Sequence, residues 1–224
     1  MKPSEKVPST MQRIAELFVE AGVPPGVFQI VHGAAEVVTS MCDHRGIAAM
    51  TFVGSSKVAE IVATRCRAIN KRVLALGGAK NHLVALSDCD ATMASRDIVA
   101  SFAGCAGQRC MAASVLLIVG ENDPLLGEVV ATAAKLTPGQ AGGQVGPLID
   151  GIAKKRVLDY INQAEAAGAT LLLDGRSWAS RGEGFWVGPT IILHSSATEP
   201  AVQDEIFGPV LSVLKVDSWE EAIG

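Results

Sequence analysis

Hydrophobic positions in the first third of the chain alternate between helical and strand spacing. Apolar residues at 14, 17, 18 and 21 recur at the helical period, and Ser9 before them can cap a helix. Gly22 and the run Pro24-Pro25-Gly26 end that helix. Strand, helix, strand, helix and strand are then expected in turn, at residues 27–31, 34–42, 47–53, after Gly54-Ser55-Ser56, and at 72–76. This order is typical of half of a doubly wound nucleotide-binding sheet.

After Gly77-Gly78 helix and strand patterns still alternate, but the character of the pattern changes. We therefore expect a domain boundary near residues 76–78. The second part, residues 77–224, reads as another α/β domain in which residues 137–147, rich in glycine and proline, form a surface loop. Strands are expected at 83–86, 114–119, 170–173, 186–193 and 210–216, and helices at 91–102, 124–136 and 151–167.

Both ends of the sequence lie inside expected elements. The chain begins with a helix that has no strand before it, and it finishes at residues 220–224, apparently within a helix. Domains seldom end inside an element, so we expect an internal piece of a longer protein. The alternative is a complete small α/β domain.

Composition excludes several classes of function. A net charge of −4 gives no electrostatic reason to expect a nucleic-acid partner, and no apolar run reaches the length of a membrane span. Five irregularly spaced cysteines argue against a disulfide framework and for a reducing compartment, which we take as the cytoplasm, with the mitochondrial matrix as the alternative. Cys105 and Cys110 are the one close pair, and no residue at zinc-ligand spacing accompanies them, so we expect no metal site.

The segment from Phe102 to Ala112 is the strongest candidate for chemistry. Cys110 follows a turn of small residues that leaves room for a ligand. The guanidinium of the adjacent Arg109, together with backbone N–H groups, would favour a thiolate and an anionic substrate. From composition alone, the alternative is a cysteine that packs as a small apolar side chain.

A second candidate lies in the first part of the chain. Gly54-Ser55-Ser56 leaves a strand and opens a helix, so its backbone donors and hydroxyls can meet a phosphate, although helix capping alone would explain the serines. Lys2 and Glu5 are a cation and a carboxylate at the edge of the same part, where a carboxylate can bind ribose hydroxyls and where surface charge is the alternative.

Four motifs, in order along the chain, resemble the aldehyde dehydrogenase superfamily. The match covers essentially all of this chain, which corresponds to only about the middle half of a full-length family member. The motifs are Met1-Lys-Pro-Ser-Glu-Lys-Val-Pro8, Phe52-Val-Gly-Ser-Ser56, Gly107-Gln-Arg-Cys110 and Glu205-Ile-Phe-Gly-Pro-Val210. Further segments resemble the CoA-acylating methylmalonate-semialdehyde dehydrogenases: Cys42-Asp-His44, Gly78-Ala-Lys-Asn-His82, Ala106-Gly-Gln-Arg-Cys-Met-Ala112, Leu172-Leu-Asp-Gly-Arg176 and Val187-Gly-Pro-Thr-Ile-Ile192.

The resemblance implies a partial Rossmann-like NAD-binding domain at residues 1–76 and a catalytic domain, incomplete at its C-terminus, at 77–224. It implies that Cys110 is the nucleophile and that Arg109 binds the substrate carboxylate, which suits a planar bidentate donor. The residues that it implies for NAD are Lys2 and Glu5 at the adenosine ribose, Lys6 beside the adenosine, Ser55 at the pyrophosphate and Glu205 at the nicotinamide ribose.

One position departs from the acid-forming members, which carry a glutamate two residues before Gly77-Gly78, where this chain has Ala75. A methyl group cannot activate water. A thioester on Cys110 would then persist until CoA took the acyl group, giving propanoyl-CoA or acetyl-CoA from methylmalonate or malonate semialdehyde. The alternatives are an acid-forming enzyme and a non-catalytic remnant.

Two further features of the family bear on activity. The asparagine that donates to the oxyanion in other members would lie before Met1, and the segment that closes the catalytic domain and carries the oligomerisation arm would follow Gly224. The resemblance implies that the full-length form is a homo-oligomer, a dimer or a tetramer, whose partners are an aldehyde, NAD and CoA.

Overall fold

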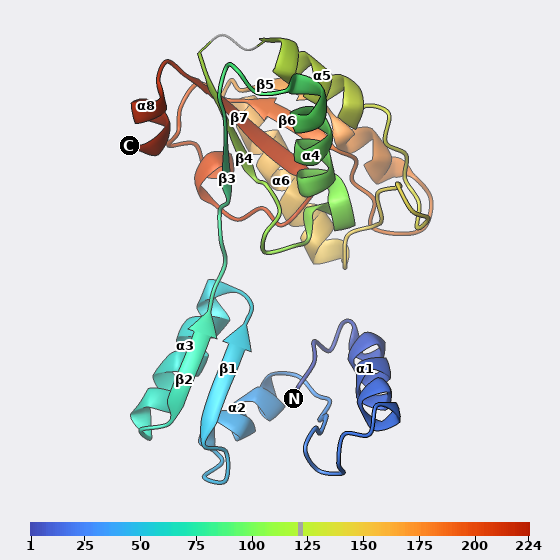
Figure 1. Ribbon diagram of the computed structural model, residues 1–224, viewed down its shortest axis with the longest axis vertical. Coiled ribbons are helices and arrows are strands. Elements are labelled where there is room, and N and C mark those ends of the chain that lie inside the picture. The colour runs from blue at the N-terminus through green and yellow to red at the C-terminus, as the bar shows by residue number, and fades with distance from the viewer. Residues whose placement is uncertain (121–122) are drawn as a thin grey trace. The chain divides into compact units, whose positions relative to one another are not determined.

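The computed structural model describes residues 1–120 and 123–224, which form two compact units, the N-terminal unit Met1–Gly78 and the C-terminal unit Ala79–Gly224 (Figure 1). The division falls within two residues of the expected boundary, whereas the NAD-binding and catalytic roles of the two parts stay predictions. The N-terminal unit contains, in chain order, α1 (Pro8–Glu20), α2 (Ala35–Asp43), β1 (Ala49–Val53), α3 (Ser56–Ala68) and β2 (Arg72–Leu76).

A β-α-β arrangement forms the centre of the N-terminal unit. Strands β1 and β2 pair in parallel, from Ala49 opposite Arg72 to Val53 opposite Leu76, and α3 connects them. The polypeptide therefore passes from the carboxyl end of β1 directly into the N-terminus of α3, which is the part of such a unit that offers free backbone N–H groups to an anion.

The core of this unit is small and contains two cysteines. Cys42 of α2 and Cys66 of α3 are buried with Met50 and Val62. Burial, and then the hydrogen bond with Cys66, raises the pKa of the Cys42 thiol to about 11. Because the thiolate is the reactive form of cysteine, Cys42 is protected from alkylation near neutral pH.

The strand expected at residues 27–31 is wrong, because this segment forms bends and irregular coil. Its backbone bonds to Met1 and to the preceding turn: the Met1 amino group donates to the Gln29 carbonyl at 2.6 Å, the Val31 amide donates to the Met1 carbonyl at 3.0 Å, and the Val27 amide donates to the Pro24 carbonyl at 3.2 Å. Apolar spacing makes a segment extended, but a strand also needs a neighbour that continues the ladder. Helix α1 also begins one residue before Ser9, at Pro8, and no side chain caps it.

The C-terminal unit is a five-stranded sheet with helices on both sides. The strands lie in the order β3-β4-β7-β6-β5, the first four parallel to one another and β5 antiparallel to β6. In chain order the elements are β3 (His82–Ala85), α4 (Ala91–Ala103), η1 (Gly104–Gly107), β4 (Val115–Val119), α5 (Asp123–Ala133), α6 (Gly151–Ala166), β5 (Thr170–Leu173), η2 (Gly175–Ser180), β6 (Thr190–Leu193), α7 (Pro200–Gln203), β7 (Val210–Val216) and α8 (Trp219–Ile223).

Strand β4 shows how the two faces of the sheet are covered. Leu116 and Ile118 point into the larger core, which includes the apolar side of α4 and α5, and the alternating residues Val115 and Leu117 pack with Val202 of α7. Figure 1 shows α4 and α5 over one face of the sheet and α6 beyond the other. A strand buried on both faces reads as a continuous apolar run, which explains why β4 and β7 were found from the sequence.

Strand β6 is shorter than the expected strand at 186–193, since only Thr190–Leu193 joins the ladder. The residues before it are held by other segments: the Gly188 amide donates to the Gly175 carbonyl at 2.9 Å. Pro189 has no N–H to give a neighbouring strand. The apolar run therefore continues past the end of the hydrogen-bonded strand.

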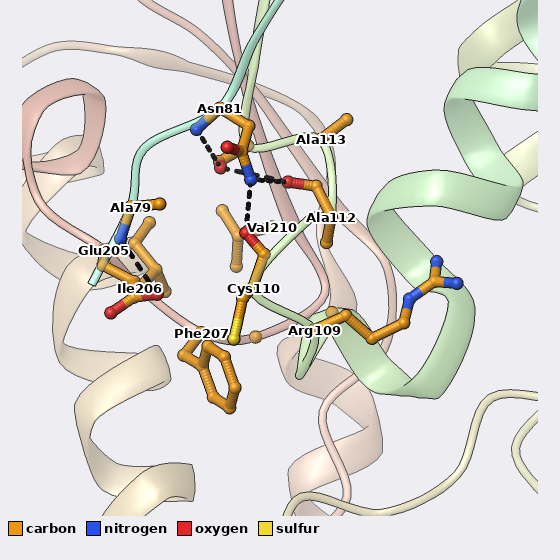
Figure 2. Close-up of a pocket in the computed structure, with 13 residues that line it drawn as sticks. Ala79, Asn81, Arg109, Cys110, Ala112, Ala113, Glu205, Ile206, Phe207 and Val210 are labelled. Atoms are coloured by element: carbon orange, nitrogen blue, oxygen red, sulfur yellow. Dashed lines mark hydrogen bonds between the residues drawn. The ribbon is translucent and has the colours of Figure 1, made fainter. Parts of the chain in front are cut away.

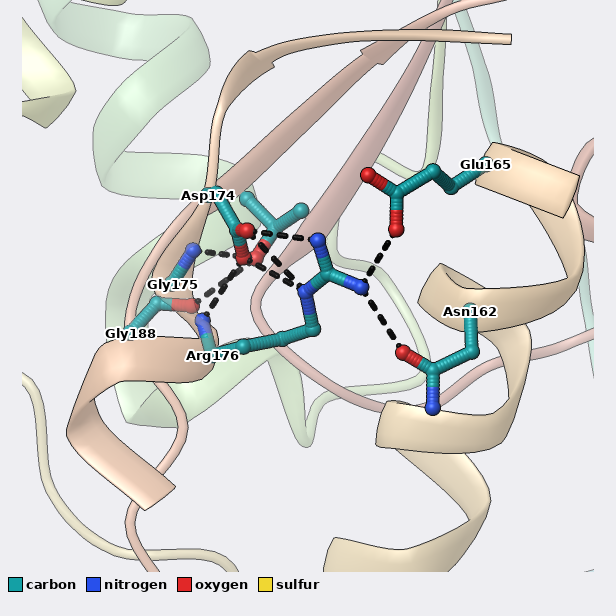
Figure 3. Close-up of polar contacts among 7 residues, drawn as sticks. Asn162, Glu165, Asp174, Gly175, Arg176 and Gly188 are labelled. Carbon is teal, nitrogen blue, oxygen red and sulfur yellow. Dashed lines mark hydrogen bonds and ion pairs between the residues drawn. The ribbon is translucent and has the colours of Figure 1, made fainter. Parts of the chain in front are cut away.

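Arg176 fixes the turn after β5 against α6 (Figure 3). Its guanidinium forms a salt bridge with Asp174 at 2.7 Å, and its Nη1 donates to Glu165 at 2.7 Å and to Asn162 at 2.8 Å. The Asp174 carboxylate also accepts from the Arg176 amide at 2.9 Å, and the Arg176 side chain is the main reason why the pKa of Asp174 is lowered. The motif Asp174-Gly175-Arg176 therefore stabilises the packing of the turn after β5 against α6.

Candidate active site

Three segments that are far apart in sequence meet at one edge of the C-terminal sheet. Ala79–Asn81 precedes β3, Cys110 precedes β4, and Glu205 precedes β7. These three strands are parallel neighbours, with Val115 of β4 opposite both His82 of β3 and Ser212 of β7. Residues that come just before neighbouring parallel strands lie at the same sheet edge, so the topology brings Cys110 and Glu205 together.

The predicted nucleophile and the predicted ribose-binding carboxylate line the same hollow (Figure 2). Its volume is about 20 Å³, room for about one water molecule, and Asn81 and Phe207 also line it. Cys110 is exposed, and its thiol points toward the Phe207 ring in Figure 2. The structure therefore offers an accessible thiol and an acceptor for hydroxyl groups on one small surface.

The turn that leads into Cys110 is left-handed. Cys105, Ala106 and Gly107 have φ angles of 52°, 52° and 69°, a conformation that costs a residue with a side chain about 1–2 kcal/mol. A Cβ atom on Gly107 would lie 2.0 Å from the Gly208 carbonyl oxygen. Only glycine permits this approach, so the cysteine turn packs directly against the loop that follows Glu205.

Asn81 holds the backbone of the segment that follows the turn, at Cys110 and at Ala112. Its Nδ2 donates to the carbonyl of Cys110 at 2.7 Å and to the carbonyl of Ala112 at 2.9 Å. Gln108 secures the other side: its Oε1 accepts from the Ile149 amide at 2.9 Å. These side-chain amides fix the Cys110 backbone and leave its thiol unobstructed.

Arg109 lines the hollow, but its guanidinium points away toward α4 (Figure 2). Nη2 donates to the carbonyls of Ala100 and Ser101, each at 2.8 Å. A cation at the carboxyl end of a helix satisfies carbonyls that have no partner within the helix. The carboxylate-binding role of Arg109 stays a prediction, and it requires these bonds to be exchanged for bonds to the substrate.

Glu205 is half-buried and is tied to the segment before β3. Its Oε1 accepts a long hydrogen bond, 3.4 Å, from the Ala79 amide. Because a carboxylate has several acceptor positions, this contact leaves capacity for ribose hydroxyls. The role of Glu205 at the nicotinamide ribose stays a prediction.

The other predicted NAD residues lie in the N-terminal unit. The Lys2 ammonium contacts the Glu5 carboxylate at 3.2 Å and donates to the Gly33 carbonyl at 2.9 Å. The Glu5 backbone amide, and then Lys2, hold the pKa of Glu5 below its usual value. Lys6 is exposed in the same segment. The structure therefore brings Lys2 and Glu5 into contact, and their role at the adenosine ribose stays a prediction.

Ser55 lies at the N-terminus of α3, exposed, and its hydroxyl makes no capping hydrogen bond. The neighbouring Ser56 instead accepts from the Gly78 amide at 3.1 Å. Elsewhere in this unit Glu5 lines an open cleft of about 610 Å³ together with residues of α1 and with His32 and Gly33. Both features are compatible with a nucleotide, and neither identifies one.

Within residues 1–120 and 123–224, no group of three or more His, Cys, Asp and Glu side chains could hold a metal ion. Among the same residues, every helix is too short or too polar to cross a lipid bilayer.

The sequence interpretation assigned no role to Asn81, Lys80 or Phe207. The first two lie in Gly78-Ala-Lys-Asn-His82, between β2 and β3, where polar side chains follow two glycines. The contacts of these two residues depend on which strands are neighbours, and the sequence alone does not give that order. Phe207 was recognised only as part of the Glu205 motif.

Comparison with known proteins identifies relatives over the full chain. The family model described as aldehyde dehydrogenase family matches residues 1–224. Malonate-semialdehyde dehydrogenase 1 of Geobacillus thermodenitrificans (strain NG80-2) is 44% identical over 228 residues, covering 100% of this chain and 47% of that protein. This chain thus spans about half the length of the curated relatives that it matches.

Solved structures agree with this assignment. A crystal structure of methylmalonate-semialdehyde dehydrogenase from Oceanimonas doudoroffii is 39% identical, with a TM-score of 0.94 over 99% of this chain and 47% of its own. The second is a crystal structure described as methylmalonate-semialdehyde dehydrogenase from Sinorhizobium meliloti 1021 in complex with NAD. It is 35% identical to this chain, with a TM-score of 0.93 over 99% of this chain and 47% of its own. The protein has the mixed α/β fold of these enzymes, and the chain belongs to the aldehyde dehydrogenase family.

Proposed function

We propose that this chain provides the nucleophile and coenzyme-binding residues of an NAD-dependent, CoA-acylating dehydrogenase of malonate or methylmalonate semialdehyde. The observation that carries the proposal is the shared hollow, where the exposed Cys110 thiol lies with the Glu205 carboxylate. A thiol alone would be weak support, but family membership and the adjoining carboxylate make a covalent oxidation the best-supported chemistry.

Cys110 would act by forming a bond to the substrate. Its thiolate attacks the aldehyde carbon and gives a thiohemiacetal, in which the former carbonyl carbon carries sulfur, oxygen and hydrogen. A bound NAD would supply the acceptor for that hydrogen, which would leave the carbon as hydride. The product left on the protein is a thioester of Cys110.

Five residues of this chain suit a dinucleotide. The contacting pair Lys2 and Glu5 would hold the adenosine ribose, with Lys6 beside the adenosine, and Ser55 would meet the pyrophosphate at the N-terminus of α3. Glu205 would hold the nicotinamide ribose. A structural relative is complexed with NAD, which supports this choice of coenzyme.

The choice of CoA as acyl acceptor rests on Ala75 of β2. Release of an acid needs a base to activate water, and a methyl group cannot serve. The CoA thiol ionises readily near neutral pH and attacks the thioester directly, which returns the Cys110 thiolate and gives acyl-CoA. Both semialdehydes would also lose their carboxylate as CO2, so that malonate semialdehyde would give acetyl-CoA and methylmalonate semialdehyde would give propanoyl-CoA.

The proposal is tested by a product assay. Because the chain spans about half of its relatives, we define a hybrid enzyme in which residues 1–224 replace the matching segment of the Geobacillus thermodenitrificans protein. With malonate semialdehyde, NAD and CoA it should form NADH and acetyl-CoA in equal amounts, measured by absorbance and mass spectrometry. A folded hybrid that forms no NADH, or forms free acid at the same rate without CoA, contradicts the proposal.

Arg109→Leu should weaken the use of malonate semialdehyde far more than the use of propanal, which has no carboxylate. A charge-assisted bidentate pair contributes roughly 1.5–3 kcal/mol, so kcat/KM for the acidic aldehyde should fall on the order of 10- to 150-fold in the hybrid enzyme. The measurement compares kcat/KM for both aldehydes. Equal losses on both would assign Arg109 to the contact with the end of α4 instead.

A further inference from the structure

The loop that carries Glu205 is held by side chains from two sides. From α6, the Tyr160 hydroxyl donates to the Asp204 carboxylate at 2.9 Å, and Arg156 Nε donates to the Ile206 carbonyl at 3.1 Å. From the segment before β3, the Lys80 ammonium donates to the Asp204 carbonyl at 2.8 Å. The residues on either side of Glu205 are therefore both fixed through their backbone carbonyls.

Lys80 makes the most extensive of these contacts. Its Nζ also donates to the Ala201 carbonyl in α7 at 2.8 Å, so one half-buried ammonium joins the helix and the Glu205 loop. The residues on each side of Lys80 contact the two predicted site residues: the Ala79 amide meets the Glu205 carboxylate, and Asn81 holds the Cys110 carbonyl. Three consecutive residues thus connect the nucleophile segment to the carboxylate segment.

We propose that Lys80 is a positioning residue that sets the place of the Glu205 carboxylate relative to Cys110 and thereby the binding of the nicotinamide ribose. The inference rests on the proposed function, because it takes Glu205 as the ribose-binding group. Lys80 itself touches only protein carbonyls and acts through the loop. Charge-assisted hydrogen bonds are about twice as strong as neutral ones, so a lysine in this place fixes the loop better than a neutral donor would.

The charge of Lys80 should vary within the working pH range. Burial lowers the pKa of Lys80 to about 8, against the attraction of Asp204 and Glu205, which raises it. These two carboxylates are the charged groups that face the ammonium; α7 contributes the Ala201 carbonyl, and the His82 ring lies at the Lys80 carbonyl. Above pH 8 the neutral amine would lose the charge assistance and loosen the loop.

The test compares Lys80→Met, Lys80→Arg and a matched control, Lys154→Met, in the hybrid enzyme. Lys154 of α6 also donates to a backbone carbonyl, that of Ala179 at 2.7 Å, which lies outside the Glu205 loop. We measure KM for NAD and inhibition by AMP, which carries the adenosine end of NAD and lacks the nicotinamide ribose. Lys80→Met should raise KM for NAD about 10-fold and leave the inhibition constant of AMP unchanged.

The other variants separate positioning from a general loss of structure. Lys80→Arg keeps a permanent positive charge and should retain KM for NAD within about threefold of the parent, and Lys154→Met should match the parent. Equal effects of Lys80→Met and Lys154→Met, or weaker AMP binding in step with weaker NAD binding, would overturn the inference. An inactive parent hybrid would instead refute the proposed function.

A pH profile provides the second readout, and it does not depend on the folding of Lys80→Met. In the parent, KM for NAD should rise about fivefold between pH 7 and 9.5 as the ammonium is lost, because the charged hydrogen bonds become neutral ones. In Lys80→Arg the same profile should be flat, since the guanidinium stays protonated. Identical profiles in the two proteins would show that another group titrates, and the inference would fail.

Discussion

Replacing Cys110 by alanine is expected to abolish aldehyde-dependent NADH formation in the hybrid enzyme. Loss of a covalent nucleophile removes the reaction path itself, so kcat should fall on the order of 10⁴-fold or more. Cys105→Ala is the matched control. Cys105 is also exposed, and its left-handed φ of 52° is already adopted by the neighbouring Ala106, so alanine adds no new strain there.

Thiol labelling checks the same assignment without an activity assay. Under limiting iodoacetamide, mass spectrometry should find the label first on Cys110, and Cys42 and Cys66 should react last because both are buried away from the reagent. For Cys42, burial also raises the pKa of the thiol, and the thiolate is the reactive species. An active Cys110→Ala variant, or preferential labelling of Cys105 together with loss of activity in Cys105→Ala, would contradict the assignment of the nucleophile.

Without CoA, the hybrid enzyme should release a burst of about one NADH per active site and then turn over slowly. The burst follows from thioester formation, and the slow phase follows from Ala75, because a general base typically contributes 10²- to 10⁴-fold to attack by water. CoA should therefore raise the steady rate by about 100-fold or more, with ping-pong kinetics. Stopped-flow absorbance of NADH, with and without CoA, measures both phases.

Ala75→Glu provides the matched variant for this experiment. A carboxylate at this position should raise the steady rate without CoA and shift part of the product to free acid. Fast turnover of the unmodified hybrid without CoA, with acid as the product, would mean that another group activates water. The CoA-acylating assignment would then be wrong.

Continuous apolar runs made parts of the fold predictable from the sequence. Strands at 72–76 and 210–216 were predicted with the bounds that the structure gives them, because β-branched and aliphatic residues there are interrupted sharply by glycine or charge. The strand at 27–31 was wrong, since spacing says nothing about whether a neighbouring strand exists. Strand β6 was overestimated for a similar reason: the Gly188 amide bonds to Gly175 outside the ladder, and Pro189 has no N–H to give.

The candidate site depended on motifs more than on spacing. The Gly107–Cys110 and Glu205–Val210 motifs named Cys110 and Glu205, but nearly a hundred residues separate them in the sequence, and only the adjacency of β4 and β7 brings them to one hollow. The sequence also could not predict the direction in which a side chain points. The resemblance implied that Arg109 binds the substrate carboxylate, whereas its guanidinium lies at the end of α4.

The contact between Gly107 and Gly208 limits how the protein can be redesigned or can diverge. A side chain on Gly107 would meet the Gly208 carbonyl, and a Cβ atom on Gly208 would lie 2.4 Å from the Val157 side chain. A single substitution at either glycine would therefore create a steric clash, so laboratory evolution can replace these glycines only after a compensating change. A mutant library meant to alter aldehyde preference should keep both glycines and vary Met111 and Phe207, which flank Cys110 and the hollow and offer side chains that can change in size.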